Sequence, residues 1–402
     1  MSVFKDKHVV LAVTGGIAAY KSAELTRMFM TEEAMVRVVM TKSACQFITP
    51  LTFQSLTRAP VATDLWESEG SVEINHISLA DWADVVVIAP ATANIIGKMS
   101  NGIADDFLST FLLAVRAPIV ICPAMNVNMY NHPVVQENLV RLKSLNYHMV
   151  DPGYGALACG TEGQGRLAEL EHIVEETRFV MSPQDLTGLT VMVTSGPTRE
   201  RWDDIRYMSN ISSGKMGVAL AKNACQRGAE VILVTGPTVL PVPYKIQTIP
   251  VGSTVEMQEA VNEHFDRVDV LIGAAAPMDF RPAKRVKGKV KKTEVPAPIE
   301  LASNPDILAG VGKKKGDKIL VGFAAEAENM IKYARGKLEA KNLDFIVANQ
   351  IGAPGTAFTT DTNQVSIITR AGEVEELPLL PKEEVAGLIL DRVLSIVSER
   401  RG

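Results

Sequence analysis

The chain has 402 residues, which is too long for one hydrophobic core, so two domains are expected. Apolar residues make up 47% and charged residues 22%, as in an ordinary globular protein, and the net charge is −5. This balance argues against a dedicated nucleic-acid binder or membrane binder. No apolar run is long enough to span a bilayer, and Met1 leads directly into a strand, so no signal peptide is expected.

Cysteine usage points to a reducing compartment. The cysteines are widely spaced and form no C-x-x-C or His/Cys metal-binding pattern; they are Cys45, Cys122, Cys159 and Cys225. We therefore expect free thiols in a cytoplasmic protein.

The first strands are followed by turns that suit a phosphate. A strand over 9–13 leads into a glycine turn and a helix over 17–30, so backbone N–H groups can approach an anion. The strand over 35–40 ends in Thr41-Lys42-Ser43, where a dinucleotide fold needs an acidic residue, and the third glycine of G-x-G-x-x-G is missing. We therefore expect a mononucleotide such as FMN in preference to NAD. The residues expected to bind it are Gly15, Gly16, Thr41 and Ser43.

Two later strands end in small and amide side chains. The strand over 85–89 is followed by residues that can admit a flat ring; they are Pro90, Ala91, Thr92 and Asn94. The alternative for this stretch is a loop with a helix cap. The run 119–122 predicts a strand buried on both faces of a parallel sheet, ended by Pro123. Asn126 then presents a carboxamide where ligands bind in open α/β sheets, although a turn asparagine is the alternative.

His76 and Cys159 are the candidates for proton transfer. Histidine titrates near neutral pH, although a lone histidine is more often a surface or capping residue. Cys159 lies in the stretch 152–166, which has five glycines and no periodic apolar pattern, so a lid-like loop is expected there. A free cysteine normally fills a core, but such a loop offers little core to fill.

These motifs, in this order, resemble the homo-oligomeric flavin-containing cysteine decarboxylases over residues 9–179. Within that family the similarity is to the phosphopantothenoylcysteine decarboxylases of coenzyme A biosynthesis. The resemblance implies an FMN cofactor that oxidises the substrate's thiolate to a thioaldehyde, after which CO2 leaves and an enethiolate forms. It also implies that Asn126 holds the departing carboxylate, that His76 acts near the thiol, and that Cys159 supplies a proton.

A polar, turn-rich stretch over 182–188 predicts the domain boundary, which gives domains 1–182 and 183–402. The strand-turn pattern then restarts at residues 191–198. Residues 209–217, with serines, glycines and a lysine, open a helix that runs to about Arg227. This composition suits a triphosphate, although it is not a Walker A loop and a capped helix is the alternative.

A basic stretch between Arg281 and Lys292 contains seven lysines and arginines. Its valines and prolines predict a flexible flap that brings cations to a triphosphate. A solvated surface and a nucleic-acid patch are the alternatives, and the lack of aromatic residues among the lysines disfavours single-strand binding.

The second half resembles the phosphopantothenate–cysteine ligases. The resemblance implies CTP with Mg2+, attack of the phosphopantothenate carboxylate on the α-phosphate, and displacement of CMP by cysteine. Lys289 would stabilise phosphate charge and Asn210 would hold the acyl intermediate. The implied substrate and nucleotide residues are Ser212, Ser213, Gly214, Lys215, Gly217, Ala275, Ala276, Asp279, Asn304, Pro305, Asp306, Ile307, Phe323, Lys337 and Lys341. Pro277, Met278 and Gln350 depart from the pattern, which puts the strength of the ligase activity in doubt.

Together the halves predict an α/β protein with two Rossmann-like parallel-sheet domains in tandem, a flavodoxin-like domain and then a ligase domain. The tandem resemblance implies a bifunctional enzyme of bacterial coenzyme A biosynthesis, with trimers of the first domain and dimers of the second. Three alternatives remain open. They are a decarboxylase of peptide C-terminal cysteines with an inert second half, an electron carrier or regulatory subunit, and a two-domain NAD(P) oxidoreductase.

Overall fold

The structure is a computed structural model that describes residues 3–65, 76–156, 160, 162–291, 299–326, 330–350 and 360–401. The chain divides into two compact units, Met1–Ser182 and Pro183–Gly402. Cys45, Cys122 and Cys225 are reduced cysteines outside any disulfide, as expected, whereas Cys159 lies outside the described residues. No helix within the described ranges combines the length and the apolarity needed to cross a lipid bilayer.

The first unit is built on a parallel sheet of five strands. Their order across the sheet is β2 (Met35–Met40), β1 (His8–Val13), β3 (Val85–Ala91), β4 (Ile119–Pro123) and β5 (His148–Met149). This 2-1-3-4-5 order is the flavodoxin-like arrangement. Every residue of β3 and β4 is buried, as expected for a strand that is covered on both faces.

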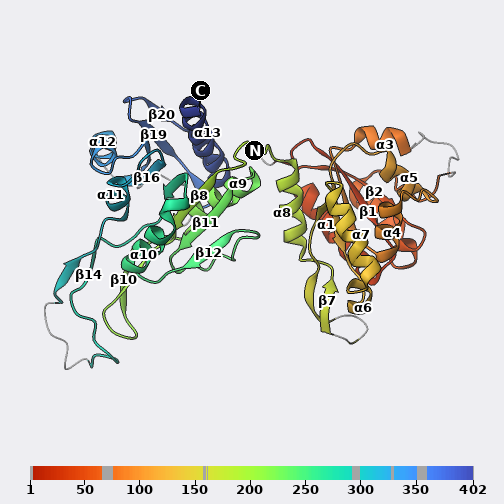
Figure 1. Ribbon diagram of the computed structural model, residues 1–402, viewed down its shortest axis with the longest axis horizontal. Helices are drawn as coiled ribbons and strands as arrows, with labels where there is room; N and C mark the ends of the chain where they lie inside the picture. Colours follow the sequence, from red (N-terminus) through yellow and green to blue (C-terminus); the bar gives the residue numbers. More distant parts are fainter. Residues whose placement is uncertain are drawn as a thin grey trace. The chain divides into compact units, whose positions relative to one another are not determined.

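Helices cover both faces of this sheet (Figure 1). On one face α1 (Lys21–Thr31) and α8 (Leu170–Met181) pack Phe29 and Ile173 against the side chains of Val9 and Leu11. The opposite face of β1, which includes Val10, packs in a core that several other helices share. Among them are α4 (Ala93–Asn101), α5 (Phe107–Ala114) and α7 (Pro133–Ser144). Successive residues of β1 thus enter different cores, which is why the strand reads as a continuous apolar run.

Two predictions for the first unit need correction. The stretch 152–166 is not a loop without regular structure, because β6 (Gly153–Ala156) and β7 (Glu162–Arg166) form an antiparallel hairpin. Its glycines hide the apolar alternation by which strands are recognised in a sequence. The helix expected from Ile17 begins as a short 3-10 helix, Ile17–Tyr20, and becomes α-helical only at Lys21.

The second unit contains an eight-stranded sheet, of which six neighbouring strands are parallel. The parallel strands are β12 (Gln247–Pro250), β11 (Glu230–Thr235), β8 (Thr190–Ser195), β13 (Val270–Gly273), β16 (Ile319–Glu326) and β17 (Phe345–Gln350). Two antiparallel strands that the sequence analysis passed over, β19 (Val365–Thr369) and β20 (Val374–Glu376), complete one edge. The fold class is confirmed, with this antiparallel edge as an addition.

Two sets of helices enclose this second sheet (Figure 1). One core contains α9 (Lys215–Gln226) and α13 (Lys382–Arg401). The other contains α10 (Thr254–His264), α11 (Ile307–Gly312) and α12 (Met330–Ala340). The shorter elements of the chain are α2 (Pro50–Thr57), α3 (His76–Trp82), α6 (Val127–Tyr130), β18 (Thr362–Asn363), β21 (Leu380–Pro381) and the 3-10 turns Ala44–Gln46 and Phe265–Arg267.

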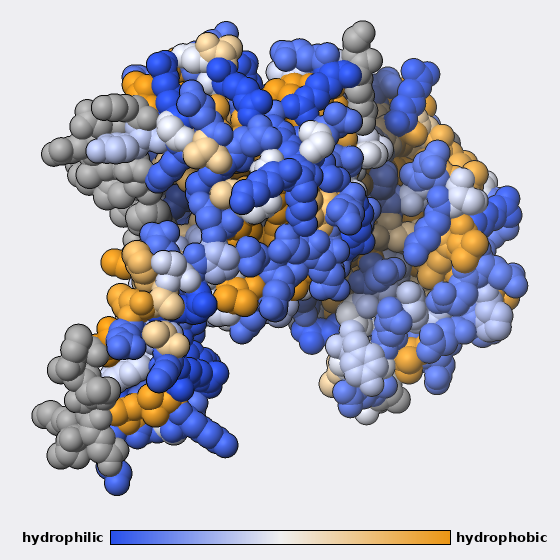
Figure 2. Space-filling view, turned by 60° about the vertical axis from the view of Figure 1, so that its left-hand side comes forward, coloured by the Kyte–Doolittle hydropathy of each residue, from blue (hydrophilic) through white to orange (hydrophobic). Residues whose placement is uncertain are grey.

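Two short hairpins extend from one end of the second unit. They are β9 (Arg199–Arg201) with β10 (Tyr207–Ser209), and β14 (Phe280–Pro282) with β15 (Leu301–Ser303). Large apolar side chains are exposed on and beside them, namely Ile205, Tyr207, Ile211, Phe280 and Leu301. In Figure 2 this projecting part shows apolar surface between hydrophilic side chains. Exposed apolar clusters of this kind commonly mark interfaces.

Candidate functional site

A cavity of about 960 Å³ lies in the first unit, beside the loops that follow four strands of the sheet. The loops after β1, β2, β3 and β4 each contribute to its wall, with Thr14–Gly16, Met40–Ser43, Thr92–Asn94 and Ala124–Asn126 respectively. Because all these strands are parallel, their carboxyl ends meet at one edge, which is where open α/β sheets bind ligands.

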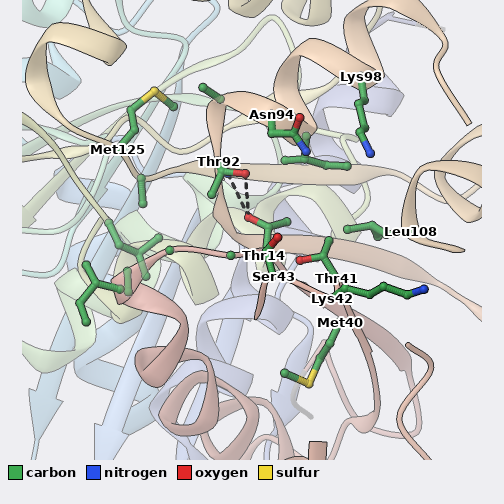
Figure 3. Close-up of a pocket in the computed structure, with 18 of the residues that line it drawn as sticks. Thr14, Met40, Thr41, Lys42, Ser43, Thr92, Asn94, Lys98, Leu108 and Met125 are labelled. Atoms are coloured by element: carbon green, nitrogen blue, oxygen red, sulfur yellow. Dashed lines mark hydrogen bonds between the residues drawn. The ribbon is translucent and has the colours of Figure 1, made fainter. Parts of the chain in front are cut away.

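Thr14 and Thr92 join the loops of β1 and β3 at this edge (Figure 3). The Thr14 hydroxyl donates to the Pro90 carbonyl at 2.7 Å and accepts from the Thr92 backbone N–H at 3.1 Å. Thr14 is almost fully buried, so this network is fixed before any ligand arrives. In the 2-1-3-4-5 order the strand sequence reverses between β1 and β3, and this junction is the switch point where such folds place FMN.

Gly15 brings the first two loops into direct contact. A Cβ atom on Gly15 would lie 2.3 Å from Ser43 Cβ and 2.9 Å from the Ser43 carbonyl carbon. No side chain fits there without moving the backbone of the second loop. Gly16 is less constrained, since a Cβ there would come no nearer than 3.6 Å to Thr92 Cγ2.

Ion pairs line the other side of the cavity. Lys42 pairs with Asp64 at 2.6 Å, and Lys98 contacts both Asp105 at 2.5 Å and Asp106 at 2.7 Å. Burial alone would raise the pKa of Asp106, but hydrogen bonds from Lys98 and Ser109 outweigh it and lower that pKa. Asp106 also caps α5 by accepting from Ser109 N–H at 2.8 Å.

Asn126 caps the short helix α6 at the floor of the same cavity, where its Oδ1 accepts from Asn128 N–H at 2.8 Å. The hairpin β6–β7 packs directly on this segment. Met125 N–H donates to the Gly165 carbonyl at 2.9 Å, and a Cβ on Gly165 would lie 2.3 Å from Met125 O. The segment that carries the predicted carboxamide is therefore in direct backbone contact with the hairpin.

The cavity wall includes most of the residues expected to bind FMN or the substrate. Those that line it are Gly15, Gly16, Thr41, Ser43, Thr92, Asn94 and Asn126. Pro90 and Ala91 are buried behind the wall, where the Pro90 carbonyl supports Thr14. His76 is the first residue of α3, is half-buried, and is not among the lining residues. Its role and that of Cys159, which lies outside the described residues, stay predictions.

The residues of the wall fit a flavin mononucleotide. Phosphate is commonly held by hydroxyl and ammonium groups, which Thr41, Ser43 and Lys21 supply here. The close approach of Gly15 to Ser43 also brings the backbone of both loops to the cavity wall. Ile95, Leu108 and Met125 supply apolar surface for a ring system. Four residues of the wall were not predicted from the sequence, namely Lys98, Asp105, Asp106 and Arg166, although an Asp-Asp pair at the start of an apolar helix is a visible signal.

In the second unit Asn210 is joined to the segment after β13. Its Nδ2 donates to the carbonyls of Ala276 at 3.2 Å and Pro277 at 2.9 Å. Ala276 N–H in turn donates to Gly196 O at 2.9 Å, in the turn after β8. Pro277 accepts this hydrogen bond through its backbone carbonyl, which any residue at that position would provide, so its departure from the family pattern does not remove the contact.

Other predicted ligase residues lie beside this segment. Asn304 N–H donates to Asp279 O at 2.8 Å, and Asn304 Nδ2 donates to Met278 O at 2.8 Å. Asp306 caps α11 and pairs with Lys341 at 2.9 Å. Ile307 is buried in the adjacent core. The structure thus brings the motif 304–307 to the turn 276–279.

The motif 212–217 wraps closely around the turn after β8. Gly214 has a φ of 77° and caps α9, and its carbonyl accepts from Ser195 Oγ at 2.9 Å. A Cβ on Gly217, in the first turn of α9, would lie 2.5 Å from Ser195 Oγ, so this position needs glycine. Lys215 pairs with Asp361 at 2.6 Å.

Phe323, Lys337 and Lys289 lie on other elements of the second unit. Phe323 lies in β16, Lys337 lies in α12, and Lys289 is exposed in the basic stretch. The side chain of Gln350 is outside the described part of the chain.

Comparison with known proteins links both units to families. Residues 3–181 match the family model described as Flavoprotein, and residues 186–397 match the DNA/pantothenate metabolism flavoprotein C-terminal domain. The chain is 47% identical over 398 residues to the coenzyme A biosynthesis bifunctional protein CoaBC of Bacillus subtilis (strain 168), covering 98% of each chain. It is 42% identical over 399 residues to CoaBC of Escherichia coli (strain K12), again covering 98% of each.

A solved structure of the C-terminal domain of a coenzyme A biosynthesis bifunctional protein CoaBC is 42% identical to this chain. It matches with a TM-score of 0.47 and covers 54% of this chain and 99% of its own. Since the similarity to the full-length relatives extends over nearly the whole of both sequences, this chain belongs to the family of coenzyme A biosynthesis bifunctional proteins.

Proposed function

We propose that this protein carries out two consecutive reactions of coenzyme A biosynthesis, one in each unit. The second unit joins cysteine to 4'-phosphopantothenate with CTP. The first unit then decarboxylates 4'-phosphopantothenoylcysteine to 4'-phosphopantetheine. The observation that carries the proposal is the cavity at the β1/β3 switch point, which Asn126 and the hairpin around Cys159 flank. The family of the whole chain supports the pairing of the two activities.

In the first unit the phosphate of FMN would lie against the loops that carry Gly15, Gly16, Thr41 and Ser43. When bound, FMN supplies the two-electron oxidation of the substrate's thiolate and the return of the electrons after CO2 has left. The carboxamide of Asn126 would orient the carboxylate that is lost. An amide suits this task, because a permanent positive charge would stabilise the carboxylate and oppose its departure.

Cys159 would donate a proton to the enethiolate carbon, since an ordinary thiol with a pKa of about 8.5 remains protonated at neutral pH. His76 would act on the substrate thiol as a base or a positioning residue. Because His76 does not line the cavity of its own chain, we propose that a neighbouring copy supplies it in a homo-oligomer.

In the second unit we propose that CTP binds with Mg2+ between the motif 212–217 and the motif 304–307. Asn210, tied to Ala276 and Pro277, would hold the phosphopantothenoyl group. Lys289 would stabilise the charge that develops on the phosphates during acyl-cytidylate formation. Phe323, Lys337 and Lys341 would line the nucleotide site, and the exposed apolar hairpins would support assembly of this unit with a second copy.

Lys289→Gln separates the two activities in one polypeptide. We expect this variant to release pyrophosphate from CTP and phosphopantothenate much more slowly and to keep decarboxylation of supplied phosphopantothenoylcysteine. Decarboxylation without any pyrophosphate release by the unaltered protein would favour the alternative, a decarboxylase of peptide C-terminal cysteines with an inert second unit. Equal loss of both activities in the variant would contradict the assignment of one activity to each unit.

The proton-donor role of Cys159 has its own test. Cys159→Ser is expected to stop after CO2 release and to accumulate an oxidised, decarboxylated product, which mass spectrometry would detect. Normal formation of phosphopantetheine by this variant would rule the role out. A cytoplasmic location stays a prediction that rests on the sequence.

A further inference from the structure

Two consecutive aspartates hold the backbone on both sides of Lys289. Gly288 precedes Lys289; its N–H donates to Asp204 Oδ2 at 2.7 Å, and its carbonyl accepts from Asp204 N–H at 3.2 Å. Val290 follows Lys289, and its N–H donates to Asp203 Oδ2 at 3.3 Å. Both neighbours of the lysine are thus bound to the same turn, which lies 84 or more residues away in sequence.

Arg206 closes this arrangement around Val290. Its Nη2 donates to the Val290 carbonyl at 2.7 Å and to Asp203 Oδ2 at 2.7 Å, and its Nε reaches the same oxygen at 3.0 Å. The carboxylate of Asp203 also accepts the backbone N–H groups of Ile205 and Arg206 at 2.9 and 2.6 Å. Both carboxylate oxygens of Asp203 therefore accept hydrogen bonds from donors that fix their direction.

Asp203 is fully buried, which alone would raise its pKa. Hydrogen bonds from the backbone of Arg206 and Ile205, from the guanidinium group of Arg206 and from Val290 N–H outweigh burial and hold the pKa far below its usual value. The carboxylate remains charged at neutral pH and accepts these bonds throughout the working range.

Two further contacts tie the basic stretch to the same turn. Arg285 Nη2 donates to Asp204 Oδ1 at 3.0 Å, and Val286 N–H donates to the Trp202 carbonyl at 2.9 Å. Gly288 has a φ of 82°, a conformation that glycine adopts without strain. The described part of the stretch, up to Lys291, is therefore anchored, in contrast to the flexible flap expected from the sequence.

We infer that Asp203, Asp204 and Arg206, which we call the aspartate clasp, are positioning residues that place Lys289 for the ligase reaction. The inference rests on the proposed function of the second unit. A lysine on a fixed backbone has only its side chain to order when the triphosphate binds. Cations contribute most to charge stabilisation when they are in place before the reaction.

Asp204→Ala tests this inference with little disturbance, because it removes the partner of Gly288 N–H and Arg285 and leaves the buried Asp203 intact. We expect kcat for pyrophosphate release to fall by about 10- to 100-fold, since a shift of about 1 Å can cost about 100-fold. The KM for CTP should change less, because the groups that bind the nucleotide remain. Decarboxylation in the same preparation should be unchanged, which shows that the protein is folded.

Matched variants separate positioning from general destabilisation. Glu373→Ala breaks another exposed ion pair of the second unit, with Arg392 at 2.7 Å, and should leave pyrophosphate release unchanged. Asp204→Asn keeps an acceptor for Gly288 N–H and should recover part of the lost rate. When Lys289→Gln is already present, adding Asp204→Ala should lower the rate of pyrophosphate release little further, because the effects of residues that act as a unit do not add. Full multiplication of the two losses, or no loss from Asp204→Ala alone, would overturn the inference.

Limited trypsin digestion measures the anchor without relying on catalysis. Cleavage after Lys287, Lys289 and Lys291 requires local opening of the segment, so it should be faster in Asp204→Ala than in the unaltered protein or Glu373→Ala. Equal cleavage rates in all three proteins would show that Asp204 does not restrain the basic stretch, which would contradict the proposed role of the aspartate clasp. If the unaltered protein released no pyrophosphate, the ligase function would fail, and the digestion would still decide whether the clasp holds its segment.

Discussion

Met125 and Gly165 are joined by a backbone hydrogen bond of 2.9 Å, and this contact connects the two halves of the proposed decarboxylase site. Met125 immediately precedes Asn126 on the loop after β4, while Gly165 lies in β7, the strand that follows Cys159 in the sequence. Since Gly165 leaves no room for a Cβ, the two backbones touch. The contact therefore fixes the hairpin β6–β7 against the segment that carries Asn126.

Gly165→Ala should damage decarboxylation more than it damages the fold. Its Cβ would lie 2.3 Å from Met125 O, and the φ of 146° disfavours any side chain. Overpacking of this kind costs about 1–3 kcal/mol, which displacing the hairpin would relieve. We expect the decarboxylation rate to fall sharply while the ligase rate stays the same. Gly102→Ala is the control, because Gly102 also has a positive φ, of 65°, but nothing lies within 4 Å of a Cβ there. Equal effects of the two substitutions would show that the contact with Met125 is unimportant.

Gly15→Ala should release FMN. The new Cβ would collide with the backbone carbon of Ser43 at 2.9 Å, so the loops after β1 and β2 must separate. Gly16→Ala provides a graded comparison, because its nearest neighbour is a methyl group at 3.6 Å. Flavin absorbance retained after gel filtration measures the loss, which should be much larger for Gly15→Ala. Full flavin content in both variants would place the cofactor elsewhere.

Thr14→Val removes the hydroxyl that links Pro90 and Thr92. The half-buried Thr92 N–H and the buried Pro90 carbonyl would then lack their shared partner, which costs about 1–3 kcal/mol. We expect a lower melting temperature for the first unit and weaker binding of FMN. Thr14→Ser keeps the hydroxyl and should restore both properties, whereas failure of serine to do so would mean that the methyl group matters more than the hydrogen bonds.

Much of the fold follows from the sequence because buried parallel strands leave a strong signal. The apolar runs in β1, β3 and β4 predict their strands closely, and the loops after them contain most of the predicted cavity residues. The hairpin β6–β7 was missed because its glycines serve close contact with Met125 and Val127 and interrupt the apolar alternation.

The meeting of distant side chains could not be predicted in the same way. Lys98 lies in α4 and Asp106 caps α5, so their contact depends on the angle between the two helices. The contact between Asp204 and Gly288 spans 84 residues and leaves no periodic trace in either segment. The composition of the basic stretch favours a mobile flap, because the sequence shows its lysines and arginines but does not show that Asp203 and Asp204 contact this stretch.

Asp106 should make the stability of the first unit depend on pH. Because its pKa lies below the usual 3.8 in the folded protein, its contribution is fully present above the unfolded-state pKa and is lost as pH falls through the folded pKa. Asp106→Asn keeps a good helix cap but loses the charge that pairs with Lys98. The unaltered protein should have the higher melting temperature near pH 7. Its advantage over Asp106→Asn should shrink as the pH falls below about 4, because Asp106 then becomes protonated. A difference that stays constant across this range would contradict an ionic contribution.

Incubation of the purified protein with 4'-phosphopantothenate, cysteine, CTP and Mg2+ tests the central claim most directly. The proposal predicts that 4'-phosphopantetheine forms, with CMP, pyrophosphate and CO2 released in equal amounts, and that Lys289→Gln makes it only from supplied phosphopantothenoylcysteine. Absence of 4'-phosphopantetheine from both the complete mixture and supplied phosphopantothenoylcysteine, with a flavin-loaded and folded protein, would contradict it.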